Sequence, residues 1–294
     1  MKKLFLVVLL ISSCTKNADL VVTNANIYTA DDEFSIMKSM AIKDGKIVEV
    51  SKENLDKFYN TEKVLNADGK TILPGLIDSH CHFYVLGEDQ LVVDLRETKS
   101  FDEIVDRLIA YNEKNNPSIL RGRGWDQNDW EIRDFPDNTL LNKFFKDKIV
   151  VLERVDGHAY IVNDYALEKA GITNKTNLKG GTVILKSNKP SGVLIDSPMG
   201  LIDNILPEKN LSEKTNALQN AEKICFENGL TSVSDAGLGI GTINLIDSLH
   251  QNDKLKINIY AMVSVSKKNI DYYRKNGKLK TDRLNVRSFK VYGD

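Results

Sequence analysis

Alternating apolar and polar positions divide the chain into a β-rich N-terminal part and a later part in which helices and strands alternate. Residues 19–73 contain three segments rich in Val, Ile, Thr and Tyr, a composition that favours strands. Two of these segments contain an Asp-Gly pair, Asp44-Gly45 and Asp68-Gly69, which is a strong hairpin signal between apolar runs. The pattern therefore predicts a small antiparallel β unit over this region.

The last third of the chain repeats a helix followed by a strand. A helix is predicted to begin near Ser212, and strands are predicted at residues 230–235, 257–263 and 286–292. A short apolar strand at residues 76–82 comes earlier. Helix–strand repetition at this spacing indicates a parallel sheet, and polar residues at the strand ends suggest the mouth of a barrel.

The middle of the chain, residues 84–210, has a mixed pattern without a clean repeat. Residues 101–112 are predicted as a helix and residues 149–152 as an apolar strand. The sequence from Arg121 to Trp125 is interrupted by two glycines, and we expect it to form a loop.

Composition narrows the class of protein without naming a function. The 294 residues are 41% hydrophobic and 28% charged, which is ordinary for a folded globular protein and allows about two domains. Lys and Arg total 40 against 41 Asp and Glu, so a nucleic-acid partner is not expected. Three cysteines are too few for a disulfide scaffold.

The N-terminus has the features of an export signal. Residues 4–11 are an unbroken apolar run after a basic start, and eight residues are too short to span a membrane as a helix. The segment that ends at Cys14 resembles the bacterial lipobox, so residues 1–13 are expected to be a lipoprotein signal peptide and residues 14–18 a tether. The alternative is a plain cleaved signal with an incidental Cys14. Lipidation would anchor the exported protein to the bacterial cell envelope, its only membrane contact, and fatty-acid labelling of Cys14 would test it.

His80 and His82 are the strongest chemical signal. Residues two apart on a strand point to the same face, which lets two neutral imidazoles bind one divalent ion. The alternative is a pair of ordinary surface histidines. Cys81 must point the other way, so it is expected to be a packed thiol.

A resemblance to a known family follows from several segments together. Residues 67–82, which include Pro74-Gly75 and the His pair, resemble the entry to the amidohydrolase superfamily. The later segments resemble the amidohydrolase-3 family and its YtcJ-like branch, and they are Gly124-Trp125-Asp126, Asp156-Gly157-His158-Ala159, Asn163 with Ala166-Leu167, Gly229–Val233 with Asp235-Ala236-Gly237, and Lys290–Asp294.

The resemblance implies an α/β fold, namely a metal-dependent (β/α)8 TIM barrel flanked by a β-sandwich built from both chain ends. Residues 19–73 would then be the N-terminal part of the sandwich. Residues 74–294 would be the first half of the barrel, truncated after about the fourth strand, with an insertion at about 84–210. The general-base Asp of the family has no counterpart, so the chain is expected to be an inactive N-terminal fragment.

The resemblance also implies a metal site. His80 and His82 would be ligands, and Lys290 matches a fourth-strand lysine that is commonly carboxylated and bridges two metals. Counting the predicted strands independently makes Lys290 a fourth-strand residue. The expected cofactor is a divalent metal, zinc, as one or two ions. The alternative for Lys290 is a core-flanking side chain that extends to solvent.

Three further residues are expected to line the substrate pocket by resemblance: His158, Trp125 and Asp126. His158 could instead stabilise a turn, and Trp125 and Asp126 could serve in loop packing. Asp235 could face the barrel mouth or cap a helix.

The expected function of the intact protein is hydrolysis of a non-peptide C–N bond in a small amide-type substrate. In such enzymes the divalent metal activates water and polarises the carbonyl. Two alternatives remain: a non-catalytic surface lipoprotein that uses the half-barrel as a binding scaffold, and a superfamily hydrolase of cyclic imides or esters.

Overall fold

The computed structural model describes residues 16–291, which divide into two units between Leu76 and Ile77. The expected signal peptide and Cys14 lie outside the described residues. Within residues 16–291, no helix combines the length and the apolar character that a membrane crossing requires. Each unit is described by itself.

The first unit consists almost entirely of short strands. They form a four-stranded sheet in the order β6-β5-β2-β8, a three-stranded sheet in the order β4-β3-β9, and the pair β1-β7. The elements are β1 (Lys16–Asn17), β2 (Leu20–Thr23), β3 (Asn26–Tyr28), β4 (Ile36–Met37), β5 (Ser39–Lys43), β6 (Lys46–Ser51), the 3-10 helix Leu55–Lys57, β7 (Tyr59–Asn60), β8 (Val64–Asn66) and β9 (Thr71–Ile72). Lys16 and Asn17 thus belong to a strand, although they fall within the predicted tether.

The two Asp-Gly pairs have different roles. Asp44-Gly45 forms the predicted hairpin between β5 and β6, with positive φ angles of 51° and 71° at the two residues. Asp68-Gly69 does not form a hairpin, because its flanking strands do not pair with each other. Strand β8 pairs in parallel with β2 in the four-stranded sheet, and β9 pairs in parallel with β3 in the three-stranded sheet. The Gly69 N–H donates to the Asn24 carbonyl at 2.7 Å, which ties this turn to the β2–β3 connection. The prediction of a wholly antiparallel unit is therefore wrong.

One part of the second unit is a five-stranded sheet in the order β10-β17-β18-β20-β19. Strands β17, β18 and β20 are parallel, and β19 adds an antiparallel edge. The predicted cycles of helix and strand are confirmed here, whereas the strands among residues 16–291 form no closed barrel. The elements are β10 (Leu76–Cys81), α1 (Phe83–Asp89), α6 (Leu211–Glu227), β17 (Leu230–Leu238), α7 (Ile240–Gln251), β18 (Asn258–Ser264), α8 (Lys267–Asn276), β19 (Leu279–Lys280) and β20 (Leu284–Lys290).

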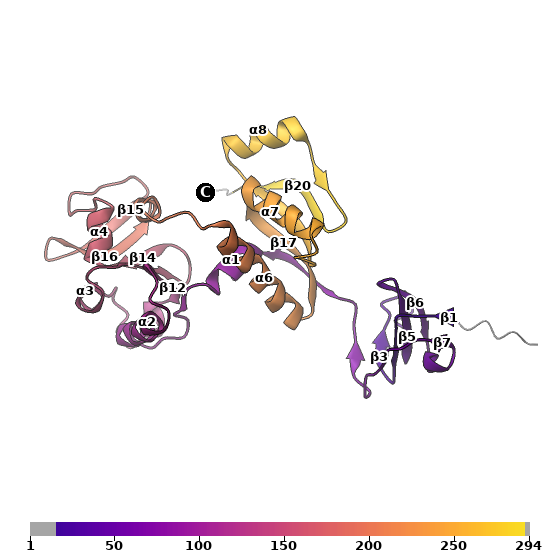
Figure 1. Cartoon of the computed structure of the whole chain (residues 1–294). Coiled ribbons are helices and arrows are strands. Elements are labelled where there is room, and N and C mark those ends of the chain that lie inside the picture. The colour runs from indigo at the N-terminus through magenta and orange to yellow at the C-terminus, as the bar shows by residue number, and fades with distance from the viewer. Residues whose placement is uncertain (1–15, 292–294) are drawn as a thin grey trace, which may run out of the picture. The chain divides into compact units, whose positions relative to one another are not determined.

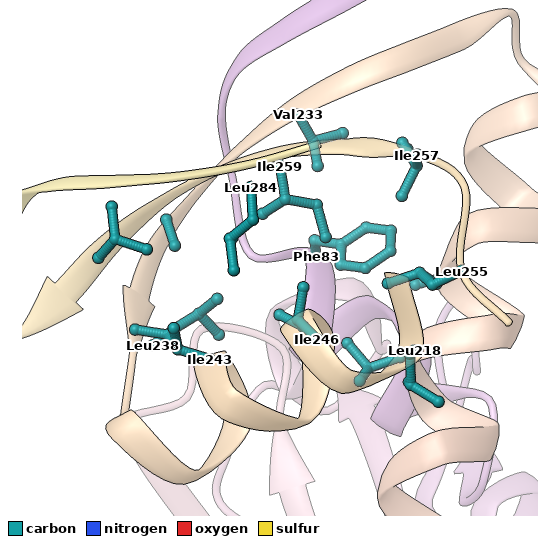
Figure 2. Packing of buried hydrophobic residues seen from close by; sticks show 14 of the residues in the cluster. Phe83, Leu218, Val233, Leu238, Ile243, Ile246, Leu255, Ile257, Ile259 and Leu284 are labelled. Carbon is teal, nitrogen blue, oxygen red and sulfur yellow. The ribbon is translucent and has the colours of Figure 1, made fainter. Parts of the chain in front are cut away.

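A hydrophobic core lies between this sheet and its helices (Figure 1). Figure 2 shows Phe83 of α1 between strand residues such as Ile259 and helix residues such as Ile246. Phe83 is only 1% exposed, so the first turn of α1 is fixed in this core. Burying a large aromatic side chain contributes about 2 to 3 kcal/mol from its apolar area.

The N-cap of helix α6 lies two residues before Ser212, the cap that the sequence predicts. Asn210, rather than Ser212, is its N-cap, because the Asn210 side chain accepts the Glu213 N–H at 3.0 Å. The Glu213 carboxylate in turn accepts the Asn210 N–H at 2.8 Å. This reciprocal capping box satisfies two backbone donors at once, which a cap at Ser212 would not.

The middle of the chain forms a second sheet of six strands, in the order β11-β12-β13-β14-β16-β15. Strands β11, β12 and β13 are parallel, and the remaining neighbours are antiparallel. The elements are β11 (Val93–Asp94), α2 (Phe101–Asn115), β12 (Ile119–Trp125), the 3-10 helix Gln127–Asp129, α3 (Thr139–Phe144), β13 (Ile149–Arg154), β14 (Ala159–Val162), α4 (Asp164–Lys169), β15 (Gly181–Lys186), β16 (Lys189–Asp196) and α5 (Met199–Asp203).

The glycine-interrupted segment from Arg121 to Trp125 is part of strand β12, so the predicted loop is wrong. The reason is the space available at Gly122. A Cβ there would lie 2.7 Å from Cδ1 of buried Leu95 and 3.2 Å from Cδ2 of Leu152. The glycine therefore permits close packing on one face of the strand, while Arg121 and Arg123 lie on the other face.

Candidate metal centre and adjoining cavity

The two histidines lie side by side at the end of β10. His80 is in the strand, and His82 is the N-cap residue of α1. Their ring centroids are 6.0 Å apart with an edge-to-face orientation, and both side chains are exposed. Cys81 between them packs against the hydrophobic core, and burial raises the pKa of its thiol to about 12. The prediction of a packed thiol is confirmed.

A buried carboxylate holds the start of α1. The Asp235 side chain, at 2% exposure, accepts the Tyr84 N–H at 2.9 Å, although the two residues are 151 positions apart. His82 makes no capping hydrogen bond with its side chain, so Asp235 takes the capping role for α1 from strand β17. Burial raises the pKa of the Asp235 carboxyl to about 6. Asp235 is thus not the N-cap residue of the helix that follows its own strand, which is Gly239, and the capping it provides is for the distant helix α1.

Lys290 is the last residue of β20, in register with Ser264 of β18. The pKa of His82 is lowered mainly by the partial loss of water around its otherwise exposed ring, and next by the charges of His80, Lys290 and Arg123. The structure therefore brings the three expected metal-site residues into one neighbourhood. A lowered pKa keeps the His82 imidazole neutral near pH 7, which is the form that binds a metal.

These residues fit part of a divalent-ion site. Two imidazoles are suitable nitrogen ligands, and a lysine becomes an oxygen ligand when its amine is carboxylated. Among residues 16–291, no group of three or more His, Cys, Asp and Glu side chains is placed to hold a metal. A catalytic zinc usually has three protein ligands. The described residues thus supply two imidazoles and Lys290, and the metal-binding role of all three stays a prediction.

A cavity of about 540 Å³ opens beside His82. One side is formed by α1, with Glu88 and Asp89, and the other by the polar face of the six-stranded sheet. Its volume lies within the range of pockets that bind small molecules. The cavity therefore places the candidate ligand His82 in the wall of a space suited to a substrate.

Ion pairs cross this cavity. Arg123 Nη1 lies 2.9 Å from Asp89 Oδ1, and Arg123 Nε lies 3.6 Å from Glu153 Oε1. Lys209 pairs with Glu88. Burial raises the pKa of the Glu153 carboxyl, and the charge of Arg123 opposes that rise. The Arg123–Asp89 pair joins α1 to the six-stranded sheet, the Arg123–Glu153 pair lies within that sheet, and the Lys209–Glu88 pair joins α1 to the segment before α6.

The three residues expected in the substrate pocket lie elsewhere. Trp125 is fully buried, and its Nε1–H donates to the Leu152 carbonyl at 2.9 Å. The Asp126 side chain caps the following 3-10 helix and lies 3.5 Å from Arg154. His158 is an exposed turn residue whose Nδ1 lies 2.7 Å from Asp196 Oδ1, a contact that raises its pKa. None of the three lines the cavity beside His82, and their role in substrate binding stays a prediction.

Three charged residues that the sequence patterns did not indicate, Arg121, Arg123 and Glu153, line the cavity. A signal was present in Arg121-Gly122-Arg123, because two arginines at a spacing of two share one face of a strand. Because the glycines favoured a loop, the sequence pattern did not predict that these two arginines share a strand face.

Comparison with known proteins identifies a family and several relatives that are similar to this chain. Residues 63–294 match the protein family described as Amidohydrolase family. The chain is 35% identical to Protein LONG AFTER FAR-RED 3 of Arabidopsis thaliana over 75% of its own length and 38% of that protein. It is 34% identical to the putative amidohydrolase YtcJ of Bacillus subtilis over 70% of the chain and 40% of the relative.

A third relative is the N-substituted formamide deformylase of Arthrobacter pascens, 27% identical over 76% of this chain and 43% of the relative. The chain thus spans about two fifths of the length of these relatives. Among solved structures, an uncharacterized metal-dependent hydrolase from Pyrococcus horikoshii superimposes with a TM-score of 0.68 at 23% identity, over 92% of this chain and 53% of that one. This likeness supports a shared fold.

Proposed function

Because the chain belongs to the amidohydrolase family, we propose that the whole protein is a metal-dependent hydrolase of non-peptide C–N bonds in small amide-type substrates. The observation that carries the proposal is the neighbouring pair His80 and His82, with His82 in the wall of the cavity. The names of two relatives, a putative amidohydrolase and a formamide deformylase, support the type of bond. The structural neighbour from Pyrococcus horikoshii is described as a metal-dependent hydrolase, which supports metal dependence.

Each residue has a separate role in this proposal. His80 and His82 would hold a divalent ion, zinc, together with Lys290 in a carboxylated form. The ion, when bound, supplies Lewis-acid activation of the scissile carbonyl and of water. Asp235 fixes the first turn of α1 and so the position of His82. The strand ends would lie at the mouth of a (β/α)8 barrel in the whole protein, because barrel enzymes carry their sites at that face.

The decisive experiment measures metal content and hydrolysis together. The protein, as its gene encodes it, is stripped of metal, reloaded with zinc, and assayed on N-substituted formamides and acetamides. We expect chelation to abolish hydrolysis and zinc to restore it. His80→Ala and His82→Ala should each lose most of the zinc and lower kcat/KM on the order of 100-fold or more, since one ligand alone binds poorly. His158→Ala is the matched control, because it removes an exposed imidazole away from the cavity.

Two outcomes would contradict the proposal. Hydrolysis that persists in both ligand variants would show that the His pair is not the centre. A folded protein that binds neither zinc nor an amide would favour a non-catalytic binding scaffold.

A further inference from the structure

Strand β12 presents two arginines to the cavity. Arg121 and Arg123 lie on the same face of the strand and both line the cavity. On the next strand, Val151 is in register with Arg121, and Glu153 is in register with Arg123. Tyr160 of β14 is in register with Glu153. This face of the six-stranded sheet is thus a largely polar wall, with His82 lining the same cavity.

The charged groups of this wall are paired, with one exception. Each of the three acidic lining residues has a cation within 4 Å: Asp89 and Glu153 have Arg123, and Glu88 has Lys209. Arg121 is half-buried, yet no hydrogen bond or ion pair joins its side chain to another group of residues 16–291. Burial raises the pKa values of Glu153 and Tyr160, and the charge of Arg121 opposes that rise, so Arg121 lies near both groups although it is paired with neither.

We propose that Arg121 binds a carboxylate of the substrate, so that the substrates are amides that carry a carboxylate group. The inference rests on the proposed function, because it assigns one end of the substrate to Arg121 and the reacting amide to the His82 side. A guanidinium binds a carboxylate with two parallel hydrogen bonds, and a partly buried one gains more from a partner than an exposed one.

The charge of the cavity favours a singly charged group over a phosphate. Its lining contains three cationic side chains and three carboxylates, so these charges balance. One added negative charge would pair with Arg121. A phosphate dianion at Arg121 would leave its second charge without an unpaired side-chain cation among the described lining residues, and the ion proposed at His82 is assigned to the reacting amide.

The test compares two probes that differ only in charge. N-Acetylglycine carries a carboxylate, and N-acetylglycinamide has a neutral amide in its place. Their dissociation constants are measured by calorimetry on the wild-type protein and on Arg121→Gln and Arg121→Lys. We expect Arg121→Gln to weaken binding of N-acetylglycine roughly 10- to 100-fold, with little change for the neutral probe. Arg121→Lys should bind N-acetylglycine with an affinity between those of the wild type and Arg121→Gln. Lysine keeps the positive charge but cannot form the two parallel hydrogen bonds of a guanidinium.

The control is Arg133→Gln, which removes an exposed arginine that lines none of the described cavities. Thermal unfolding of each variant separates a binding defect from misfolding. Acetate and inorganic phosphate are also tested as competitors. If phosphate competes better than acetate on the wild-type protein, and if Arg121→Gln removes that advantage, the proposal of a carboxylate ligand is wrong.

The two proposals fail separately. Arg121-dependent binding of N-acetylglycine by a protein that hydrolyses no amide would leave the anion site standing and remove the proposed function. Zinc-dependent hydrolysis of neutral amides that Arg121→Gln leaves unchanged, with no preference for the carboxylate, would overturn the anion site alone.

Discussion

The two sheets of the second unit present reactive side chains in different ways. In the five-stranded sheet, His80 and Lys290 lie at strand ends or next to them, while strands β17, β18 and β20 contribute buried apolar side chains to the core. In the six-stranded sheet, Arg121, Arg123 and Glu153 lie along the strands on one face, while the opposite face packs against α2. Strand ends thus carry the expected metal chemistry, and a sheet face carries the charged wall of the cavity.

This difference determines how each site depends on packing. A site at a strand end depends on the turn that follows the strand. Asp235 and Phe83 hold the first turn of α1 in place next to His82. A sheet-face site is positioned by strand register and tolerates changes at the strand ends. Substitutions that destabilise one element at a time therefore distinguish the strand-end site from the sheet-face site.

The largest effect is expected from Gly87→Ala in α1. A Cβ at Gly87 would lie 1.8 Å from the Ala217 carbonyl oxygen of α6, and a backbone atom cannot rotate away. Helix α1 would have to move, so we expect a loss of about 3 kcal/mol or more in the free energy of unfolding, measured by denaturant titration. Zinc affinity should fall as well, because α1 begins next to His82.

Gly200→Ala is a matched control, since nothing lies within 4 Å of a Cβ at that helical position. Equal stability of the two variants would show that α1 and α6 are not in close contact.

A smaller, pH-dependent effect is expected from Asp235→Asn. The pKa of Asp235 is raised from 3.8 to about 6 in the folded protein, which corresponds to on the order of 3 kcal/mol. The unfolded chain releases this proton first, so the contribution is fully present below pH 4 and is lost as the pH rises through 6. Relative to the asparagine variant, the metal-free wild-type protein should lose about 2 to 3 kcal/mol of stability between pH 4 and pH 7.

Asparagine retains an acceptor for the Tyr84 N–H, whereas Asp235→Ala removes it. The alanine variant should therefore be less stable than the asparagine variant at every pH, by about 1 kcal/mol for a lost cap. Parallel pH profiles for wild type and Asp235→Asn would contradict the buried carboxyl.

The smallest effect is expected from His158→Ala. The contact with Asp196 raises the pKa of His158, so any stabilisation is present below the unfolded value of about 6.5 and lost as the pH rises through the folded value. At pH 8 the unfolding midpoint of the variant should match that of the wild type. Zinc content and hydrolysis should also be unchanged, and a substantial loss of hydrolysis would return His158 to the substrate pocket.

The sequence predicted regular elements better than their partners. The helix predicted at residues 101–112 is observed as Phe101–Asn115, because the apolar period and the cap at Ser100 are local signals. Asp68-Gly69 carries the same local signal as Asp44-Gly45, yet its flanking strands pair in different sheets. Pairing between distant strands is a tertiary property that a turn dipeptide does not encode.

The candidate site shows the same division. The spacing of His80 and His82 predicts that they are close, as observed, although His82 lies just beyond the strand as the N-cap residue of α1. The capping of α1 by Asp235 joins residues 151 positions apart, and no local pattern indicates it. The role of Arg121 depended on recognising β12 as a strand, and its glycines obscured that, although Gly122 is required there by close packing at Leu95.

The hydrogen bond from Tyr84 to Asp235 joins residues that are far apart in the sequence, and this separation also constrains the order in which the chain folds. The first turn of α1 acquires its cap only after β17 has been made, so the segment that carries His82 is completed late. Between them lies the six-stranded sheet, Val93–Asp196, whose strands pair only with one another. If this sheet forms first, it brings the ends of the intervening chain together and shortens the loop that remains to be closed. The insertion would then act as an internal folding aid for the five-stranded sheet, and deleting it would slow assembly of the His pair.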